Sequence, residues 1–271
     1  MYSKIAPVRR TRFHALSIAG ALAALCAFPA HADDKDQIVT DRPDFVEGSN
    51  VVGAGRLQIE TGLAWDRNAA QGVKERATYT PTLLRYGISD TLEVRLETDG
   101  RLQRTTSEGP LRLRERGYGD VSLGVKWHAM DAVGNKPSVG VLVHADLESG
   151  SSAFRGDGIR PSVRVAAEWE FENGMSMGIM PGLVYQRGEQ GGVSGMFGIT
   201  FGKPITETLT SFFELSSPQI ARSRRGGTEA VFTTGLAYLL TNTVQLDTAL
   251  SRGLNSRTTD YSFTIGISVK L

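Results

Sequence analysis

The sequence predicts an all-β protein, a membrane-spanning antiparallel up-and-down β-barrel of about 12 strands. Three observations predict it: an export signal at the N-terminus, a long series of segments in which apolar and polar residues alternate, and connections that are alternately short and long. Alternation with a period of two residues is typical of strands with one apolar and one polar face. Segments of about ten such residues are long enough to cross a bilayer as tilted strands.

Residues 1–32 have the composition of a secretory signal peptide. Lys4 and three arginines precede an apolar run over residues 15–28, and the segment ends with Ala30-His31-Ala32. The apolar run is shorter than the ~20 residues that a spanning helix needs, so we expect a signal that is cleaved after Ala32 and not an anchor.

Cleavage would remove the only cysteine, Cys26, and would leave 26 basic against 29 acidic residues. A disulfide-stabilised secreted module is therefore excluded. A net charge of about −3 predicts no strongly charged partner, and no nucleic acid is expected.

Residues 33–55 are polar, lack periodicity and precede the first expected strand. Within this N-terminal segment, we expect a motif to fold into or across the periplasmic mouth as a partial plug. A disordered periplasmic tail is the competing interpretation. The motif consists of Asp41, Arg42, Pro43, Asp44 and Phe45.

Residues 56–271 are expected to form the barrel, because period-two alternation recurs along them and helical spacing is nowhere sustained. In one clear case Leu92, Val94 and Leu96 alternate with charged residues, so a strand there has all its charges on one face. The expected strands are 56–66, 77–86, 92–99, 120–128, 138–148, 160–171, 175–185, 193–201, 209–215, 228–240, 244–250 and 261–271. Pro81 lacks a ladder donor and predicts a local irregularity in the second strand.

Connection lengths distinguish a membrane barrel from a soluble β-sandwich, because outer-membrane barrels have short periplasmic turns and longer extracellular loops. Short links are expected at 87–90, 172–174, 203–207 and 241–243, with a longer one at 130–136. Longer polar connections are expected at 68–74, 101–116, 149–157, 217–227 and 252–260, and an intermediate one at 186–192. An even strand count with this alternation puts both chain ends on the periplasmic side.

The last segment, Tyr261 to Leu271, alternates without a break and ends on the final residue. It is similar to the C-terminal signature by which the barrel-assembly machinery recognises outer-membrane proteins, although Leu271 stands where an aromatic residue is usual.

Three stretches carry a family resemblance: TDRPDFVEGSNVVGAGRLQIETGLAW, LLRYGISDTLEVRLE and GYGDVSLGVKW, in this order. They resemble the outer-membrane family named "Putative MetA-pathway of phenol degradation", and the resemblance extends over essentially the whole exported chain. It implies an outer-membrane barrel that takes up aromatic or other small compounds. The DRPDF motif at residues 41–45 is its most specific part.

The inward faces of the first four expected strands carry a dense set of opposite charges. Such residues on neighbouring strands can pair across the ladder. We predict a charge-lined constriction that filters solutes, and the alternative is an ion-pair network that only fills and stiffens a narrow barrel. The set consists of Arg56, Glu60, Arg85, Glu93, Arg95, Glu97, Asp120 and Lys126.

Basic clusters occur in two of the expected extracellular loops. Arginine forks match phosphate geometry, so these loops could bind outer-membrane lipid, in particular lipopolysaccharide, or gather anionic solutes. Plain solvated loops are the alternative. The clusters contain Arg112, Arg114 and Arg116, with Arg101 and Arg104 nearby, and then Arg222, Arg224 and Arg225.

An enzyme is a weaker hypothesis. Ser122, Asp120, His144 and Asp146 could meet if their strands form a hairpin, which would supply a nucleophile, a base and an acid. All four would face the lumen, whereas hydrolysis of lipids needs a site exposed to the bilayer. No spacing predicts a metal site, a phosphate-binding loop or a cofactor.

The sequence thus predicts an outer-membrane channel or transporter for passive passage of small molecules, with aromatic compounds or their acids as the solute class. Twelve strands leave limited lumen space. A structural or surface-interaction barrel with basic loops is the alternative, and a lipid-modifying enzyme is the third possibility.

Overall fold

The computed structural model describes residues 37–70, 72–187, 191–220 and 228–271, so the expected signal peptide lies outside the described residues. These residues form fifteen strands. The strands are β1 (Leu57–Ala70), β2 (Val73–Tyr79), β3 (Thr82–Gly87), β4 (Leu92–Thr98), β5 (Arg101–Glu108), β6 (Leu111–Tyr118), β7 (Val121–Met130), β8 (Ser138–Asp146), β9 (Arg160–Glu170), β10 (Ser176–Gln186), β11 (Gly192–Pro204), β12 (Leu209–Ser217), β13 (Val231–Thr241), β14 (Val244–Gly253) and β15 (Tyr261–Lys270). In the part of the chain that the structure describes, no helix is long and apolar enough to span a membrane.

The strands form one antiparallel sheet that closes where β15 pairs with β1. Three pairs of consecutive strands each continue one another along the barrel wall. β1 pairs with β3 over its first half and with β2 over its second half, so β2 and β3 are two halves of one interrupted strand. The pairs β4 with β5 and β6 with β7 are related in the same way. The barrel therefore has twelve strands, as predicted.

The three interruptions lie beside one another. Thr80 and Pro81 separate β2 from β3, and here Thr80 donates its backbone N–H to the carbonyl oxygen of Asp99 at 3.0 Å. Gly100 adopts a positive φ of 59° at the next break, where a side chain would contact Thr80. The irregularity expected at Pro81 is confirmed, and it extends across two further strands.

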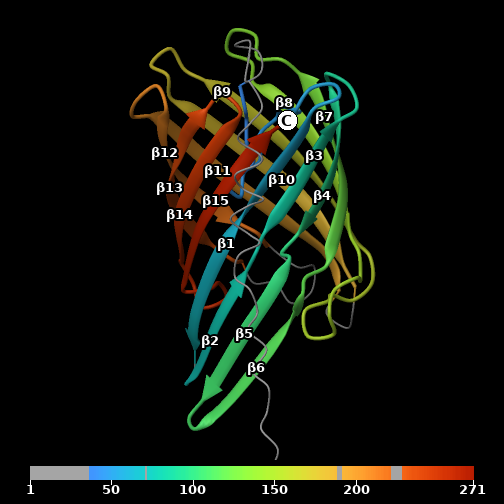
Figure 1. Ribbon diagram of the computed structural model, residues 1–271, viewed down its shortest axis with the longest axis vertical. Coiled ribbons are helices and arrows are strands. Elements are labelled where there is room, and N and C mark those ends of the chain that lie inside the picture. Colours follow the sequence, from blue (N-terminus) through green and yellow to red (C-terminus); the bar gives the residue numbers. More distant parts are fainter. Residues whose placement is uncertain (1–36, 71, 188–190, 221–227) are drawn as a thin grey trace, which may run out of the picture.

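Beyond these interruptions β5 and β6 form a hairpin that projects from the barrel, at the bottom of Figure 1. The long loop expected at 101–116 is therefore wrong, and so is the loop at 68–74, because β1 extends to Ala70 and pairs there with Val73, the first residue of β2. Both segments are rich in polar residues, and a hairpin with both faces in water has the same polar composition as a loop.

The remaining connections follow the prediction. At one end of the barrel, called here the short-turn rim, the links are 88–91, 131–137, 171–175, 205–208 and 242–243. At the other end, the long-loop rim, they include 147–159, 218–230 and 254–260. β1 begins and β15 ends at the short-turn rim, where the C-terminus is labelled in Figure 1.

The two faces of the sheet have inverted polarity compared with a soluble protein. Charged side chains such as Glu60, Arg85 and Lys126 are buried inside the barrel, whereas Trp127 and Phe263 are exposed outside it. An apolar outer face and a polar interior are typical of a transmembrane barrel, because the outer face contacts lipid and not water. This distribution excludes the soluble β-sandwich.

Candidate functional site

Residues 37–55, called here the lumen segment, precede β1 and lie inside the barrel. The blue trace in the upper part of Figure 1 follows this segment. At the short-turn rim, Ile38 donates its backbone N–H to the carbonyl oxygen of Asn242 at 2.7 Å. Farther along, the backbone N–H of Val46 donates to Glu214 of β12 and that of Val52 to Glu93 of β4. Because β4 and β12 are far apart in the sheet order, the segment spans the lumen.

Asp41 is the centre of a buried ion-pair network. Lys126 of β7 donates its ammonium to both carboxylate oxygens, at 2.9 and 2.8 Å, and a third hydrogen bond goes to the carbonyl oxygen of Gly48. Arg95 of β4 donates to the same carboxylate at 2.7 Å, and Arg85 of β3 lies 3.4 Å from it. One carboxylate of the lumen segment thus contacts cations from three wall strands.

Glu47 makes a second contact with the wall. Its carboxylate accepts hydrogen bonds from Arg95 and from Arg164 of β9. Ser49 then donates its backbone N–H to Glu168, also on β9. Arg95 is therefore shared by Asp41 and Glu47, which ties both ends of this turn of the lumen segment to one wall residue.

The wall carboxylates bind the backbone of the lumen segment and the wall arginines together. Glu60 of β1 accepts the backbone N–H groups of Asp41 and Arg42, both at 3.0 Å. Arg85 donates to Glu60 at 3.1 Å and to Glu93 at 2.9 Å. Each of these buried charges consequently has at least one ion-pair partner and further hydrogen bonds, which is the condition under which buried charges persist.

Arg42 fixes the lumen segment to the opposite side of the barrel. Its guanidinium donates to Asp247 of β14 at 3.1 Å and to the hydroxyl of Thr264 of β15 at 2.9 Å. Gly62 and Gly266 form the slot for this group, since a Cβ at either position would lie within 2.7 Å of the guanidinium nitrogen Nη2. The two glycines are therefore needed for close approach.

The carboxyl groups of the lumen segment differ in their electrostatics. Burial by itself would raise the pKa of Asp41, but Arg85, Lys126 and Arg95 hold this pKa well below its ordinary value. Against the same burial effect, Arg95 and Arg164 lower the pKa of Glu47.

Asp44 behaves in the opposite way. Burial raises its pKa well above the ordinary value, and the nearby carboxylate of Glu214 adds to the rise. A hydrogen bond donated by the hydroxyl of Thr200 at 3.2 Å opposes the shift only in part. Asp41 is thus held as an anion, whereas Asp44 favours its neutral form.

Five of the eight predicted constriction residues meet in this network, namely Glu60, Arg85, Glu93, Arg95 and Lys126. Three do not. Arg56 is exposed at the short-turn rim, just before β1. Glu97 lies one step farther toward the long-loop rim, with its carboxylate 3.7 Å from His144 and its side chain half exposed.

Asp120 anchors a loop instead of lining the constriction. It accepts backbone N–H groups from Ser149, Gly150 and Gly156, and its carboxylate pairs with Arg160 at 2.6 Å. Asp120 lies between β6 and β7, outside a regular strand. Period-two alternation therefore does not determine the direction of its side chain, and the predicted inward position was based on that alternation.

Sequence reasoning missed several residues of the network. Glu47 and Arg164 are not among the predicted site residues, although period-two alternation in the expected strand 160–171 places Arg164 on the polar face. Asp247 and Glu214 also follow the inward parity of their strands. Their partners on the lumen segment have no periodicity, so only the structure reveals the contacts.

The basic clusters are only partly described. Arg112, Arg114 and Arg116 lie in strand β6 and not in a loop, which corrects the prediction. Arg104 of β5 is on the other face of the hairpin, where it pairs with Glu115 at 2.9 Å. The predicted cluster of Arg222, Arg224 and Arg225 lies outside the described residues.

The four residues of the enzyme hypothesis do not form a catalytic constellation in the described part of the chain. Ser122 lies opposite Asp146, and His144 lies opposite Gly124, in the β7–β8 ladder. Within the described residues, neither the Ser122 hydroxyl nor the ring nitrogens of His144 have a hydrogen-bond partner. The hydrogen bond that joins a nucleophile to its base is therefore not formed.

A hollow of about 700 Å³ opens at the short-turn rim. Its lining combines the lumen segment, through residues such as Ile38, Asn50 and Val52, with rim residues Asp90 and Lys270. The lumen segment therefore forms part of the wall of this hollow.

Similar solved structures have the same fold. An outer membrane channel from Pseudomonas putida F1 superimposes with a TM-score of 0.62 at 11% identity, covering 82% of this chain and 98% of that one. The NanC porin gives a TM-score of 0.50 at 14% identity, covering 79% of this chain and 100% of that one. The likeness shows that the chain has the fold of an outer-membrane β-barrel.

No curated protein matches the chain. A family profile matches residues 40–271, which includes the DRPDF motif, the lumen segment from Thr40 onward and every strand of the barrel. The chain therefore belongs to the family described as "Putative MetA-pathway of phenol degradation".

Proposed function

We propose that the protein is an outer-membrane channel for passive passage of small molecules, and that the lumen segment is a plug that sets its permeability. The observation that carries this proposal is the path of residues 38–52, which contact wall strands on opposite sides of the lumen. A barrel of twelve strands has little spare interior, so a segment crossing it controls what passes. The short-turn rim is the periplasmic side in this proposal.

Solute movement then requires a route past the plug. The contacts of the lumen segment are hydrogen bonds and ion pairs with polar wall groups, and water or a polar solute can replace these partners one at a time. Displacement of the segment would leave the wall cations Arg95 and Lys126 without Asp41 and Glu47, their main anionic partners. The opened lumen would therefore attract anions.

The preferred solute class follows from this electrostatic change. The carboxylate of a small aromatic acid could occupy the place of the Asp41 carboxylate on Arg95 and Lys126, since arginine and lysine bind carboxylates strongly. The description of the family, which refers to phenol degradation, supports aromatic compounds as the source of such acids.

Conductance of the purified protein in planar bilayers tests the proposal. We expect a small conductance for the full chain and a several-fold larger, anion-selective conductance when residues 37–52 are deleted. Liposomes that hold either variant should take up benzoate faster than uncharged sugars of similar size. If both variants are silent in bilayers and liposomes, the channel proposal is wrong.

A structural or surface-interaction barrel is the second candidate, and the projecting hairpin of β5 and β6 favours it. In that case the lumen network would only stiffen the barrel, as dense ion pairs can. This candidate would be supported over the channel if the deletion variant showed no conductance and no solute uptake, and if removal of the hairpin abolished a surface property.

A further inference from the structure

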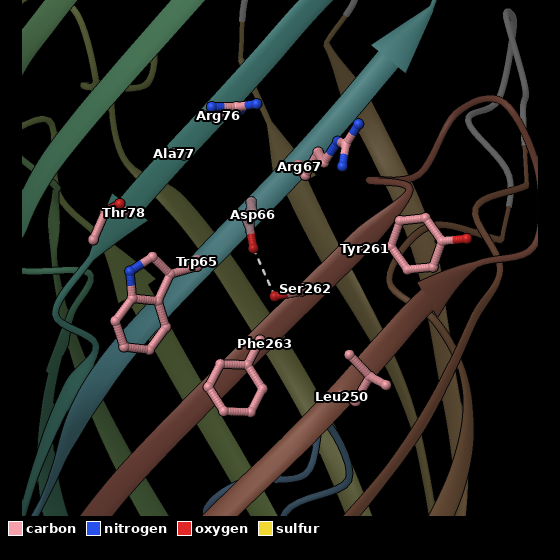
Figure 2. A pocket seen from close by; sticks show the side chains of 10 residues that line it. All are labelled: Trp65, Asp66, Arg67, Arg76, Ala77, Thr78, Leu250, Tyr261, Ser262 and Phe263. Atoms are coloured by element: carbon pink, nitrogen blue, oxygen red, sulfur yellow. Dashed lines mark hydrogen bonds between the residues drawn. The ribbon is translucent and has the colours of Figure 1, made fainter.

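A hollow of about 290 Å³ lies on the outer wall of the barrel, at the seam between β1 and β15. Figure 2 shows the side chains around it: the rings of Trp65 and Phe263 and the side chain of Leu250, with Arg67 and Tyr261 nearer the long-loop rim. The two rings are stacked, with centroids 5.7 Å apart. The part of the hollow farther from the long-loop rim is therefore apolar and faces lipid.

The strand register places basic residues next to this apolar part, on the side nearer the long-loop rim. Six residues, called here the arginine row, are successive cross-strand partners on β14, β15, β1, β2, β5 and β6. The arginine row consists of Arg252, Tyr261, Arg67, Arg76, Thr105 and Arg114. The neighbouring register row toward the membrane centre begins with Leu250, Phe263 and Trp65.

The described outward positions of these six strands carry several basic residues and no acidic ones. Lys74, Arg101, Arg112 and Arg116 share the outward parity of the arginine row. Acidic residues of the same strands have the inward parity, as shown by Asp66, which accepts a hydrogen bond from Ser262 at 2.6 Å. On the described outward positions of these six strands there is no carboxylate.

Arg67 and Arg76 lie directly opposite each other in the β1–β2 ladder. Like charges at such positions repel and destabilise a sheet, because their Cβ atoms are only about 5 Å apart. Within the described residues no ion pair joins either side chain to a carboxylate. An anion bound between the two guanidinium groups would remove this repulsion.

We propose that the arginine row and the apolar hollow beneath it bind a phosphorylated lipid of the outer leaflet, with its phosphate on Arg67 and Arg76 and its acyl chains against Trp65, Phe263 and Leu250. Guanidinium forks match phosphate geometry, and aromatic rings favour the boundary between hydrocarbon and headgroups. The continuity of the basic row with the lipid-facing wall selects a lipid over a free anion. This site is independent of any transport through the lumen.

The test uses the full-length mature barrel in phosphatidylcholine nanodiscs, titrated with lipid A and followed by native mass spectrometry. We expect lipid A to bind, dephosphorylated lipid A to bind at least about tenfold more weakly, and the double variant R67Q/R76Q to lose a similar factor. The matched control K136Q/K203Q removes two exposed lysines at the short-turn rim and should bind as the unaltered chain does.

A single variant, R252Q, provides a second measurement at the other end of the row, where the Arg252 guanidinium lies 5.3 Å from the centroid of the Tyr261 ring. Resistance to unfolding in detergent before boiling shows that each variant is folded. Unchanged affinity in R67Q/R76Q and R252Q overturns the proposal, and so does equal affinity for dephosphorylated lipid A. Complete displacement of lipid A by millimolar inorganic phosphate would identify a free-anion site and would also overturn it.

Discussion

Gly62 of β1 and Gly266 of β15 lie directly opposite each other across the seam that closes the barrel, and the guanidinium of Arg42 occupies the space that their absent side chains leave. The first and last strands are thereby joined to the lumen segment at one point. Closure of the barrel and docking of the segment are structurally linked, because the same residue pair serves both.

The first prediction concerns this slot. A Cβ at position 266 would lie 2.5 Å from Arg42 and 2.7 Å from Asp247, so Gly266→Ala should displace the guanidinium from its carboxylate partner. The lumen segment should then be cleaved faster by thermolysin, which cuts before apolar residues, when the protease is added to the detergent-solubilised barrel. Gly195→Ala is a suitable control, since a Cβ there meets only ordinary contacts at 3.6 Å. Equal cleavage of the two variants would contradict the coupling.

The second prediction concerns the pair of Asp41 and Lys126. Each partner is buried, so D41N or K126M should lower the free energy of unfolding by about 3 kcal/mol, because an uncompensated charge is left behind. The double variant should be less destabilised than the sum of the single effects, by about 1–3 kcal/mol. Urea unfolding followed by tryptophan fluorescence measures these values.

The control for this double-mutant comparison is the exposed pair of Arg155 and Glu148, whose charged atoms lie 3.7 Å apart. Solvent screens such a pair, so the coupling between R155Q and E148Q should fall between about 0 and 1 kcal/mol. Equal coupling energies for the buried and the exposed pair would show that the network around Asp41 is hydrated like a surface.

Period-two alternation was sufficient to predict the barrel, because lipid outside and polar groups inside impose opposite requirements on successive residues. It also assigned Glu60, Arg85, Glu93, Arg95 and Lys126 to a common inner wall. The same rule failed for Asp120, which lies at an interruption where alternation no longer determines direction.

The path of the lumen segment could not be derived in the same way. Its contacts join residues far apart in the sequence, such as Arg42 and Asp247, and each depends on where an aperiodic chain turns. The hairpin of β5 and β6 was also mistaken for a loop, because arginines alternate there with Leu111 and Leu113 on a segment solvated on both faces. Composition alone does not distinguish such a hairpin from a loop.

The third prediction concerns this hairpin. Thr98 and Val121 are directly paired in the β4–β7 ladder, so a two-residue Asn-Gly turn can replace residues 99–120 without changing the barrel register. The shortened chain should fold to a heat-modifiable barrel and conduct ions within about twofold of the parent, because the lumen network lies on the other side of the interruption. Failure to form a folded barrel would show that the hairpin is needed for assembly of the wall.

The fourth prediction is a pH dependence with opposite contributions from two carboxyl groups of the lumen segment. The depressed pKa of Asp41 means that its stabilising ion pairs are fully formed above the ordinary aspartate pKa and are lost only when the pH falls well below it. The raised pKa of Asp44 has the reverse effect. At neutral pH the docked segment must either bury this carboxylate or protonate it, which weakens docking, and the penalty disappears as the pH falls toward the ordinary aspartate pKa.

Docking of the lumen segment should therefore strengthen as the pH is lowered from 7 toward 4, and conductance should decrease over that interval. Asp44→Asn removes the titrating group and should give, already at pH 7, the lower conductance that the unaltered chain shows only at acidic pH. Thermolysin at pH 7 should also cleave this variant more slowly than the unaltered chain. Asp41→Asn should raise conductance at every pH in this interval, since it removes an anion that stays ionised throughout. A pH response that survives in the Asp44 variant would assign it to a different group, such as Glu214, whose carboxylate accepts the backbone N–H of Val46.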